Sequence, residues 1–164
     1  MSPVTLICAP SVRNEIQQAL FEQWRNSLGA QGFLVDALGR EHYTIDPWGQ
    51  LAKLMADVDG VVVLGFRQMD IRDGLWRRGT PEAAAVSTVW TSPWMHVEAG
   101  MAIASGKPVL VAPERGVAEG VFAAQNWTAD VFGASAEHPW SLDVKRWAWV
   151  VRDRHSSRLP ALNR

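Results

Sequence analysis

Two continuous apolar runs, GVVVLGF at residues 60–66 and KPVLVAP at residues 107–113, restrict the folds that this chain can adopt. Both are short and rich in β-branched residues, and neither alternates with polar side chains. A strand of this kind must be buried on both faces, as in a parallel sheet covered by helices. VTLICA at residues 4–9 is a third run of strand type, and FLVDAL at 33–38 has the composition of a fourth.

Segments with helical features separate these strands. From Asn14 to about Gly29, apolar residues recur at intervals of three and four. Asp46 and Ser92 can each cap a helix that a proline opens, over residues 47–58 and 93–105. A short helix near 117–124 and one from 141 to about 153 are expected next. The alternation predicts an α/β fold: a doubly wound parallel sheet of about five strands with helices on both faces.

Length and composition exclude several classes of protein. With 164 residues and 48% hydrophobic residues, the chain is expected to form one domain over residues 1–164, with 153–164 as a flexible or docking tail. Sixteen basic residues against seventeen acidic ones give no positive field for nucleic acid. A single cysteine and widely spaced histidines predict neither a disulfide nor a metal site. No spanning segment or signal peptide is visible, so we expect a cytoplasmic protein that binds no membrane.

In a doubly wound sheet, ligands bind beyond the carboxyl ends of the strands. The segments at these ends are CAPSVRN after the strand at 4–9, GFRQMD after the strand at 60–66, and residues 67–91. The last segment has no clean period, and we interpret it as a loop that serves as a lid or a dimer arm.

Glu98 is a carboxylate in the middle of a helix made largely of small and apolar residues. The spacing of Val97, Met101 and Ala104 predicts that they face the core, which places Glu98 at the edge of that face. Most helical glutamates are simply solvated. A carboxylate near the amino end of a helix that follows a strand's carboxyl end can instead stabilise or attack a cationic sugar carbon.

Other residues near the same edge suit a phosphorylated and aromatic ligand. Ser11 and Arg13 precede a helix, where backbone N–H groups and a guanidinium can bind phosphate, although both could also be solvated turn residues. Trp48 and Trp94 follow predicted helix starts and could stack on a base, although burial in the core is the alternative for each. No glycine-rich nucleotide loop and no nucleophile elbow is present.

The segment SPWMHVEAGMAIASGKPVLVAPER resembles the nucleoside 2-deoxyribosyltransferase superfamily, and within it the nucleoside 5′-monophosphate N-glycosidases that hydrolyse cytidylate and hydroxymethylcytidylate. The resemblance rests on Ser92, on Glu98 within E-x-G-x-A, and on the G-K-P that ends at Pro108, and CAPSVR resembles the phosphate loop of those enzymes. It implies a flavodoxin-like sheet, a homodimer, no cofactor, and a nucleotide substrate. Glu98 would be the nucleophile or the oxocarbenium stabiliser, and Ser11, Arg13 and Ser92 would bind the phosphate.

The chain also departs from that family. The deoxyribosyltransferases have a tyrosine near the first strand, whereas the single tyrosine here is Tyr43, which favours hydrolysis over base transfer. Their aspartate before the third strand falls here on Gly49 or Leu51, so Asp46 is taken as its substitute among the catalytic residues. Two alternatives stay open. S-x-W-x-x-x-E also resembles TIR domains, which would imply an NAD glycohydrolase or a signalling domain, and the fold could serve a non-catalytic nucleotide sensor.

Overall fold

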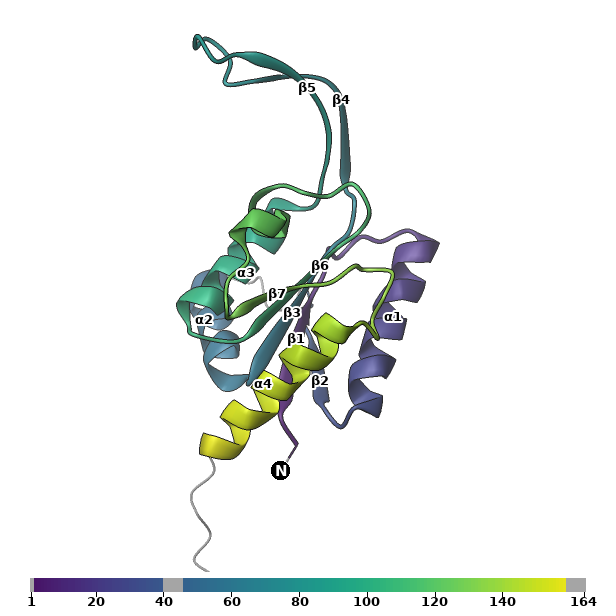
Figure 1. Cartoon of the computed structure of the whole chain (residues 1–164), viewed down its shortest axis with the longest axis vertical. Helices are drawn as coiled ribbons and strands as arrows, with labels where there is room; N and C mark the ends of the chain where they lie inside the picture. The colour runs from purple at the N-terminus through teal and green to yellow at the C-terminus, as the bar shows by residue number, and fades with distance from the viewer. Residues whose placement is uncertain (1, 40–45, 159–164) are drawn as a thin grey trace, which may run out of the picture.

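The computed structural model describes residues 2–39 and 46–158, and a five-stranded parallel sheet forms its centre (Figure 1). His42 and Tyr43 lie outside the described residues. The strand order is β2-β1-β3-β6-β7, which confirms the predicted flavodoxin-like α/β fold. The strands are β1 (Val4–Cys8), β2 (Leu34–Ala37), β3 (Gly60–Gly65), β6 (Val109–Pro113) and β7 (Val131–Gly133).

Helices cover both faces of the sheet. The helices α1 (Glu15–Ala30) and α4 (Leu142–Arg158) pack on one face, where Trp24 and Trp147 are fully buried. On the other face lie α2 (Pro47–Asp57) and α3 (Pro93–Ala104). Because side chains of a strand point alternately to its two faces, Ile7 belongs to the first core and Cys8 to the second. This alternation puts the last residue of β1 against α3.

The helix starts follow the capping predictions. The Asp46 carboxylate accepts the Gly49 N–H at 3.0 Å, and the Ser92 hydroxyl accepts the Trp94 N–H at 3.4 Å. A Cβ at Gly49 would lie 2.2 Å from Asp46 Oδ2, so the glycine makes room for the cap. At α1 the cap is Asn14, whose side chain accepts the Gln17 N–H in a capping box. The hydrogen bonds of these caps thus fix the residues at which α1, α2 and α3 begin.

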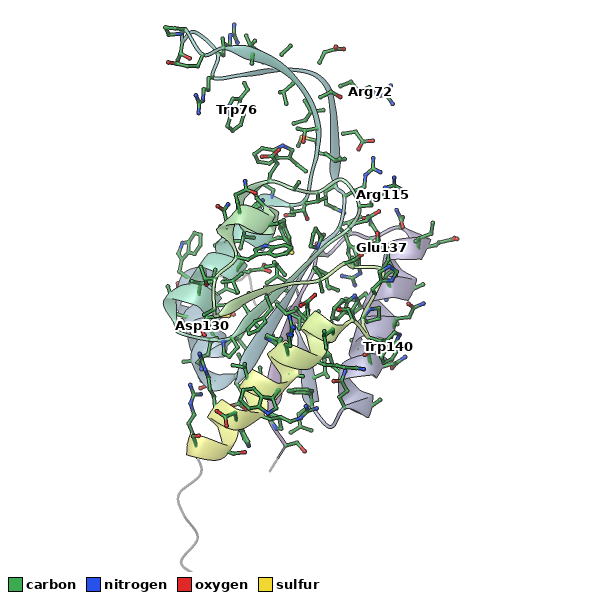
Figure 2. All side chains as sticks on the ribbon, in the orientation of Figure 1. Arg72, Trp76, Arg115, Asp130, Glu137 and Trp140 are labelled. Atoms are coloured by element: carbon green, nitrogen blue, oxygen red, sulfur yellow. The ribbon has the colours of Figure 1, made fainter. Side chains whose placement is uncertain are left out.

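Residues 67–91, which we expected to be an irregular loop, form an antiparallel hairpin of β4 (Met69–Trp76) and β5 (Ala84–Trp90). It extends away from the body of the protein (Figure 1), and the side chains of Arg72 and Trp76 stand on the extended part (Figure 2). The pairing register shifts between Ile71 and Gly74, so the alternation of side chains between the two faces is interrupted at this bulge. The sequence therefore showed no continuous strand pattern here.

The segment after β6 also differs from the expectation of a short helix near residues 117–124. It forms two single 3-10 turns, η2 (Gly120–Phe122) and η3 (Ala124–Asn126), and then β7, which the sequence did not reveal. Gly120 has a positive φ of 58°, and the Asn126 side chain donates to its carbonyl at 2.7 Å. These features favour a compact turn over a continuous helix.

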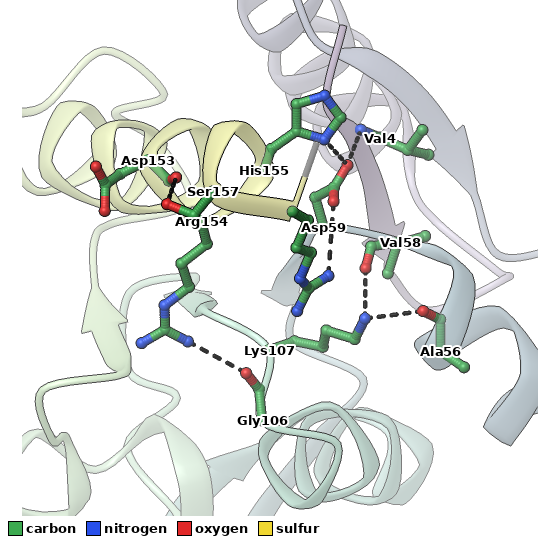
Figure 3. A network of polar contacts seen from close by, with 11 residues as sticks. Val4, Ala56, Val58, Asp59, Gly106, Lys107, Asp153, Arg154, His155 and Ser157 are labelled. Carbon is green, nitrogen blue, oxygen red and sulfur yellow. Dashed lines mark hydrogen bonds and ion pairs between the residues drawn. The ribbon is translucent and has the colours of Figure 1, made fainter. Parts of the chain in front are cut away.

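Helix α4 continues to Arg158, past the end predicted near residue 153. His155 and Arg154 hold this last part in place: His155 Nδ1 lies 2.9 Å from Asp59 Oδ2, and Arg154 donates to the Gly106 carbonyl (Figure 3). Asp59 also accepts the Val4 N–H at 2.8 Å. Residues 153–158 of the predicted flexible tail are therefore helical, because they bind the loops at the amino edge of the sheet. The rest of the tail, 159–164, lies outside the described residues.

Lys107 belongs to the same amino edge. Its ammonium group donates to the carbonyls of Ala56 at 2.9 Å and Val58 at 2.7 Å, at the carboxyl end of α2, and 4% of the residue is exposed (Figure 3). A cation at a helix carboxyl end satisfies carbonyls that have no partner within the helix. The lysine of the G-K-P segment therefore joins α2 to β6, at the edge opposite the carboxyl ends of the strands.

Candidate active site

A pocket of about 330 Å³ opens at the carboxyl ends of β1 and β2, beside the first turns of α3. Its position agrees with the rule that ligands of doubly wound sheets bind at this edge. Three chain segments form its wall: the end of β1 and the turn after it, the end of β2, and the start of α3. The lining residues are Ala9, Pro10, Ser11, Leu38, Gly39, Ser92, Trp94, Met95 and Glu98.

Glu98 lines this pocket and is 1% exposed. It lies within the buried face of α3, which consists of Met95, Glu98, Ala99 and Ala102. The expected core face was therefore wrong, since Val97 and Met101 are half-buried and Ala104 is exposed. Nearly every residue of α3 is small or apolar, so hydrophobic spacing could not identify the buried side. A carboxylate held between the sheet and the pocket is the central feature of the site.

Cys8 lies on the face of the sheet that α3 covers. It is the last residue of β1 and is fully buried, in the same core cluster as Met95 and Ala99 of α3. Burial raises the pKa of the Cys8 thiol well above its usual range, and the charge of Glu98 adds to the shift. The sequence predicted a strand over residues 4–9, but not that Cys8 lies near Glu98. Strand parity was the available signal, because it assigns Cys8 to the face that α3 covers.

An aromatic pair lies beside the pocket. The rings of Trp48 on α2 and Trp94 on α3 have centroids 5.6 Å apart and an interplanar angle of 33°. Trp94 lines the pocket, and both indoles are exposed, by 56% for Trp48 and 38% for Trp94. Both side chains are therefore at the surface rather than in the core. Exposed indoles next to a cavity offer a flat apolar surface to a planar ligand.

The residues predicted to bind phosphate are only partly brought together. Ser11 and Ser92 both line the pocket, where their hydroxyls can donate to an oxygen-rich ligand. Arg13 is not among the lining residues. Its Nε donates to Gln18 at 2.8 Å, its Nη1 donates to the Pro10 carbonyl at 2.7 Å, and its guanidinium lies 4.3 Å from the Phe21 ring centroid. Burial lowers the pKa of Arg13, against the opposing charge of Glu22.

Asp46 is likewise not among the described lining residues, and its carboxylate caps α2. Asp46 is the N-cap of α2, two positions before Trp48. Within the described residues, no group of three His, Cys, Asp or Glu side chains is arranged to hold a metal ion. The helices among these residues include none that is both long and apolar enough to cross a bilayer.

No protein-family model matches the chain, and no curated protein matches its sequence. Among solved structures, the fold is similar to that of the Clostridium botulinum CMP N-glycosidase BcmB, with a TM-score of 0.52 and 14% sequence identity. The match covers 87% of this chain and 97% of that protein. At this level of identity, the likeness shows a shared α/β fold.

Proposed function

We propose that this protein is an N-glycosidase that hydrolyses the bond between base and sugar in a nucleoside 5′-monophosphate. The observation that carries the proposal is a buried carboxylate, Glu98, in the wall of a pocket that also presents two serine hydroxyls and lies beside an exposed tryptophan pair. A carboxylate, hydroxyl donors and an aromatic surface match a cationic sugar carbon, a phosphate and a base, respectively.

In the proposed reaction, the bond between C1′ and the base nitrogen breaks, and the base leaves with the electron pair and takes up a proton from solvent. The Glu98 carboxylate stabilises the positive charge that develops at C1′ or forms a transient ester with it. Water then supplies the oxygen that bonds to C1′ and releases its proton to solvent. The products are the free base and the sugar 5-phosphate. Asp46 stays a predicted second carboxylate, at the edge of α2.

Ser11 and Ser92 are proposed to hold the phosphate, with Arg13 nearby in the same turn as Ser11. A guanidinium has five N–H groups, and the two hydrogen bonds to Gln18 and Pro10 use one on Nε and one on Nη1. A charge-assisted contact contributes about 1.5–3 kcal/mol. Arg13→Ala should therefore lower kcat/KM for a nucleotide roughly ten- to 150-fold while changing that of the matching nucleoside little. Equal losses on both substrates would contradict a phosphate role for Arg13.

A nucleoside without phosphate is the second candidate substrate. It is favoured by the charge of the pocket: Glu98 is the one ionisable side chain among the lining residues that the structure describes. An uncharged sugar would not be repelled by this carboxylate, whereas a phosphate must approach it with help from Ser11, Ser92 and Arg13. The two candidates share the catalytic carboxylate and differ in the group bound at the serines.

One experiment separates these functions. Purified protein is incubated with ribo- and deoxyribonucleoside monophosphates, the matching nucleosides and NAD, and free bases are resolved by chromatography. Base release from monophosphates alone supports the proposal, and release from nucleosides alone supports the second candidate. Nicotinamide release alone would indicate the NAD glycohydrolase. Absence of turnover, together with a higher Tm in the presence of a nucleotide, would indicate a sensor.

We also propose that the protein forms a homodimer through the β4–β5 hairpin. Met69, Leu75 and Trp76 on this hairpin are each more than half exposed, and an isolated two-stranded ribbon is marginally stable in water. Burying these side chains against a second copy would stabilise both the hairpin and the assembly. The hairpin leads directly into Ser92, so a dimer would place the interface near the pocket.

A further inference from the structure

The base of the β4–β5 hairpin is bound by side chains from two other segments, at the place where the hairpin leaves the body of the protein (Figure 1). The Glu114 carboxylate, directly after β6, accepts the Arg67 N–H at 2.8 Å. The Gln17 side chain on α1 donates to the Arg67 carbonyl at 3.0 Å and to Glu114 at 2.8 Å. Both backbone hydrogen-bonding groups of Arg67 therefore have side-chain partners, which fixes this residue between α1 and β6.

On one side, this network includes the turn that carries Ser11. The amide oxygen of Gln17 accepts the Asn14 N–H in the capping box of α1, so the side chain that binds the hairpin also fixes the first turn of the helix. The Gln68 side chain at the start of the hairpin donates to the carbonyl of Val12, the residue after Ser11, at 3.2 Å. The turn after β1 is therefore bonded to the hairpin base through two separate side chains.

On the other side, the hairpin leads into Ser92. The Gln68 N–H donates to the Trp90 carbonyl at 2.8 Å, which closes the base of the hairpin. Ser92, the N-cap of α3, comes two residues after Trp90. Thr91 between them is 2% exposed, so this connection is packed against the body of the protein. A displacement of the hairpin base would therefore move Ser11 and Ser92 relative to each other.

We infer that Glu114 is a positioning residue for the phosphate site, because it fixes the base of the hairpin and thereby the relative positions of Ser11 and Ser92. The inference rests on the proposed function, in which these two serines bind the phosphate. Glu114 is not among the described residues that line the pocket, so it acts through the hairpin. One of its oxygens, Oε2, accepts both hydrogen bonds. The geometry thus requires an acceptor oxygen at this place rather than a charge.

Steady-state kinetics test this role on the proposed reaction. Glu114→Ala should raise KM for a nucleoside 5′-monophosphate roughly two- to tenfold, because the serine hydroxyls are less well placed. It should change neither kcat nor the KM of the matching nucleoside, since Glu98 lies on the buried face of α3. Glu114→Gln keeps one acceptor oxygen and should restore KM.

Asp70→Ala is the matched control for these kinetics. It also removes a carboxylate at the hairpin, but Asp70 pairs with the side chain of Arg67, at 2.9 Å, and not with its backbone. KM should therefore stay at the wild-type value in Asp70→Ala. A wild-type KM for the monophosphate in Glu114→Ala, or an equal rise in KM for monophosphate and nucleoside, would overturn the inference.

Hydrogen exchange tests the coupling without substrate, so it separates failure of this inference from failure of the proposed function. In Glu114→Ala, backbone N–H groups of residues 11–14 and 91–95 should exchange roughly three- to tenfold faster, although the mutated side chain lies outside both segments. Gln68→Ala, at an exposed position where the core is not disturbed, removes the bond to Val12 and should accelerate exchange in residues 11–14. Asp70→Ala should change neither segment.

Faster exchange in both segments of Glu114→Ala supports the coupling whether or not the wild type releases a base. Faster exchange confined to residues 17 and 67 would show that Glu114 has a local structural role. That result would refute the inference even if the wild type proves to be a glycosidase.

Discussion

Replacing Glu98 by methionine should stabilise the protein while abolishing its proposed activity. The carboxylate is 1% exposed and lies on a helix face otherwise made of Met95, Ala99 and Ala102, so its charge is separated from bulk water. Methionine has a similar length, fills the same space, and carries no charge that burial would penalise. Replacing buried charges by apolar side chains of similar volume is often stabilising by about 1–4 kcal/mol.

Part of that gain is lost here, because Glu98 is not without a partner in the folded protein. We therefore expect the free energy of unfolding to rise by about 2 kcal/mol, which for a chain of this size corresponds to an increase in Tm of about 4–8 °C. Urea denaturation at pH 7 measures the change, as a higher midpoint with an unchanged m-value.

Gln17→Leu is the matched control, since Gln17 is also buried, with 2% exposed, but its hydrogen bonds serve the fold. Its amide donates to the Arg67 carbonyl at 3.0 Å and to Glu114 at 2.8 Å, so this variant should lose about 1–3 kcal/mol. A loss of stability in Glu98→Met as large as that in Gln17→Leu would show that Glu98 is part of the folding framework and would refute its functional assignment.

Three further predictions concern residues outside the pocket. Lys107→Met should lower the free energy of unfolding by about 2 kcal/mol, measured by urea denaturation, because two carbonyls at the end of α2 lose their donor. Trp76→Ser should convert a dimer into a monomer in sedimentation velocity, and an unchanged mass would argue against the hairpin interface. Burial lowers the pKa of His96 against the opposing charge of Glu119, so the unfolded state binds more protons and stability should fall as pH drops below about 6.5. His96→Phe should flatten this fall, as followed by Tm against pH.

The sequence predicted the alternating architecture because the strands β1, β3 and β6 are buried on both faces and therefore read as continuous apolar runs. It also predicted the caps at Asp46 and Ser92, because those interactions are local and depend on adjacent residues. β7 was missed because its three residues are too few to show a pattern. The hairpin was missed because its bulge breaks the alternation of its strands.

The candidate site was likewise predicted only in part. Glu98, Ser92 and Ser11 could be assigned to one edge of the sheet from the order of the elements alone. The orientation of Arg13 could not be predicted, since it depends on a stacking contact with Phe21 and on hydrogen bonds to Gln18 and Pro10. The buried side of α3 could not be predicted either, because its small and apolar residues give no contrast between the faces of the helix. Tertiary packing decides both features.

The catalytic role of Glu98 is tested by single-turnover base release by the wild type and by Glu98→Gln, with the best nucleotide substrate at saturating enzyme. Glutamine keeps the shape of the side chain and removes its charge. We therefore expect a fold unchanged by circular dichroism and base release slower by roughly 10²-fold or more. Base release by Glu98→Gln at a rate close to that of the wild type would show that the buried carboxylate does not perform the chemistry.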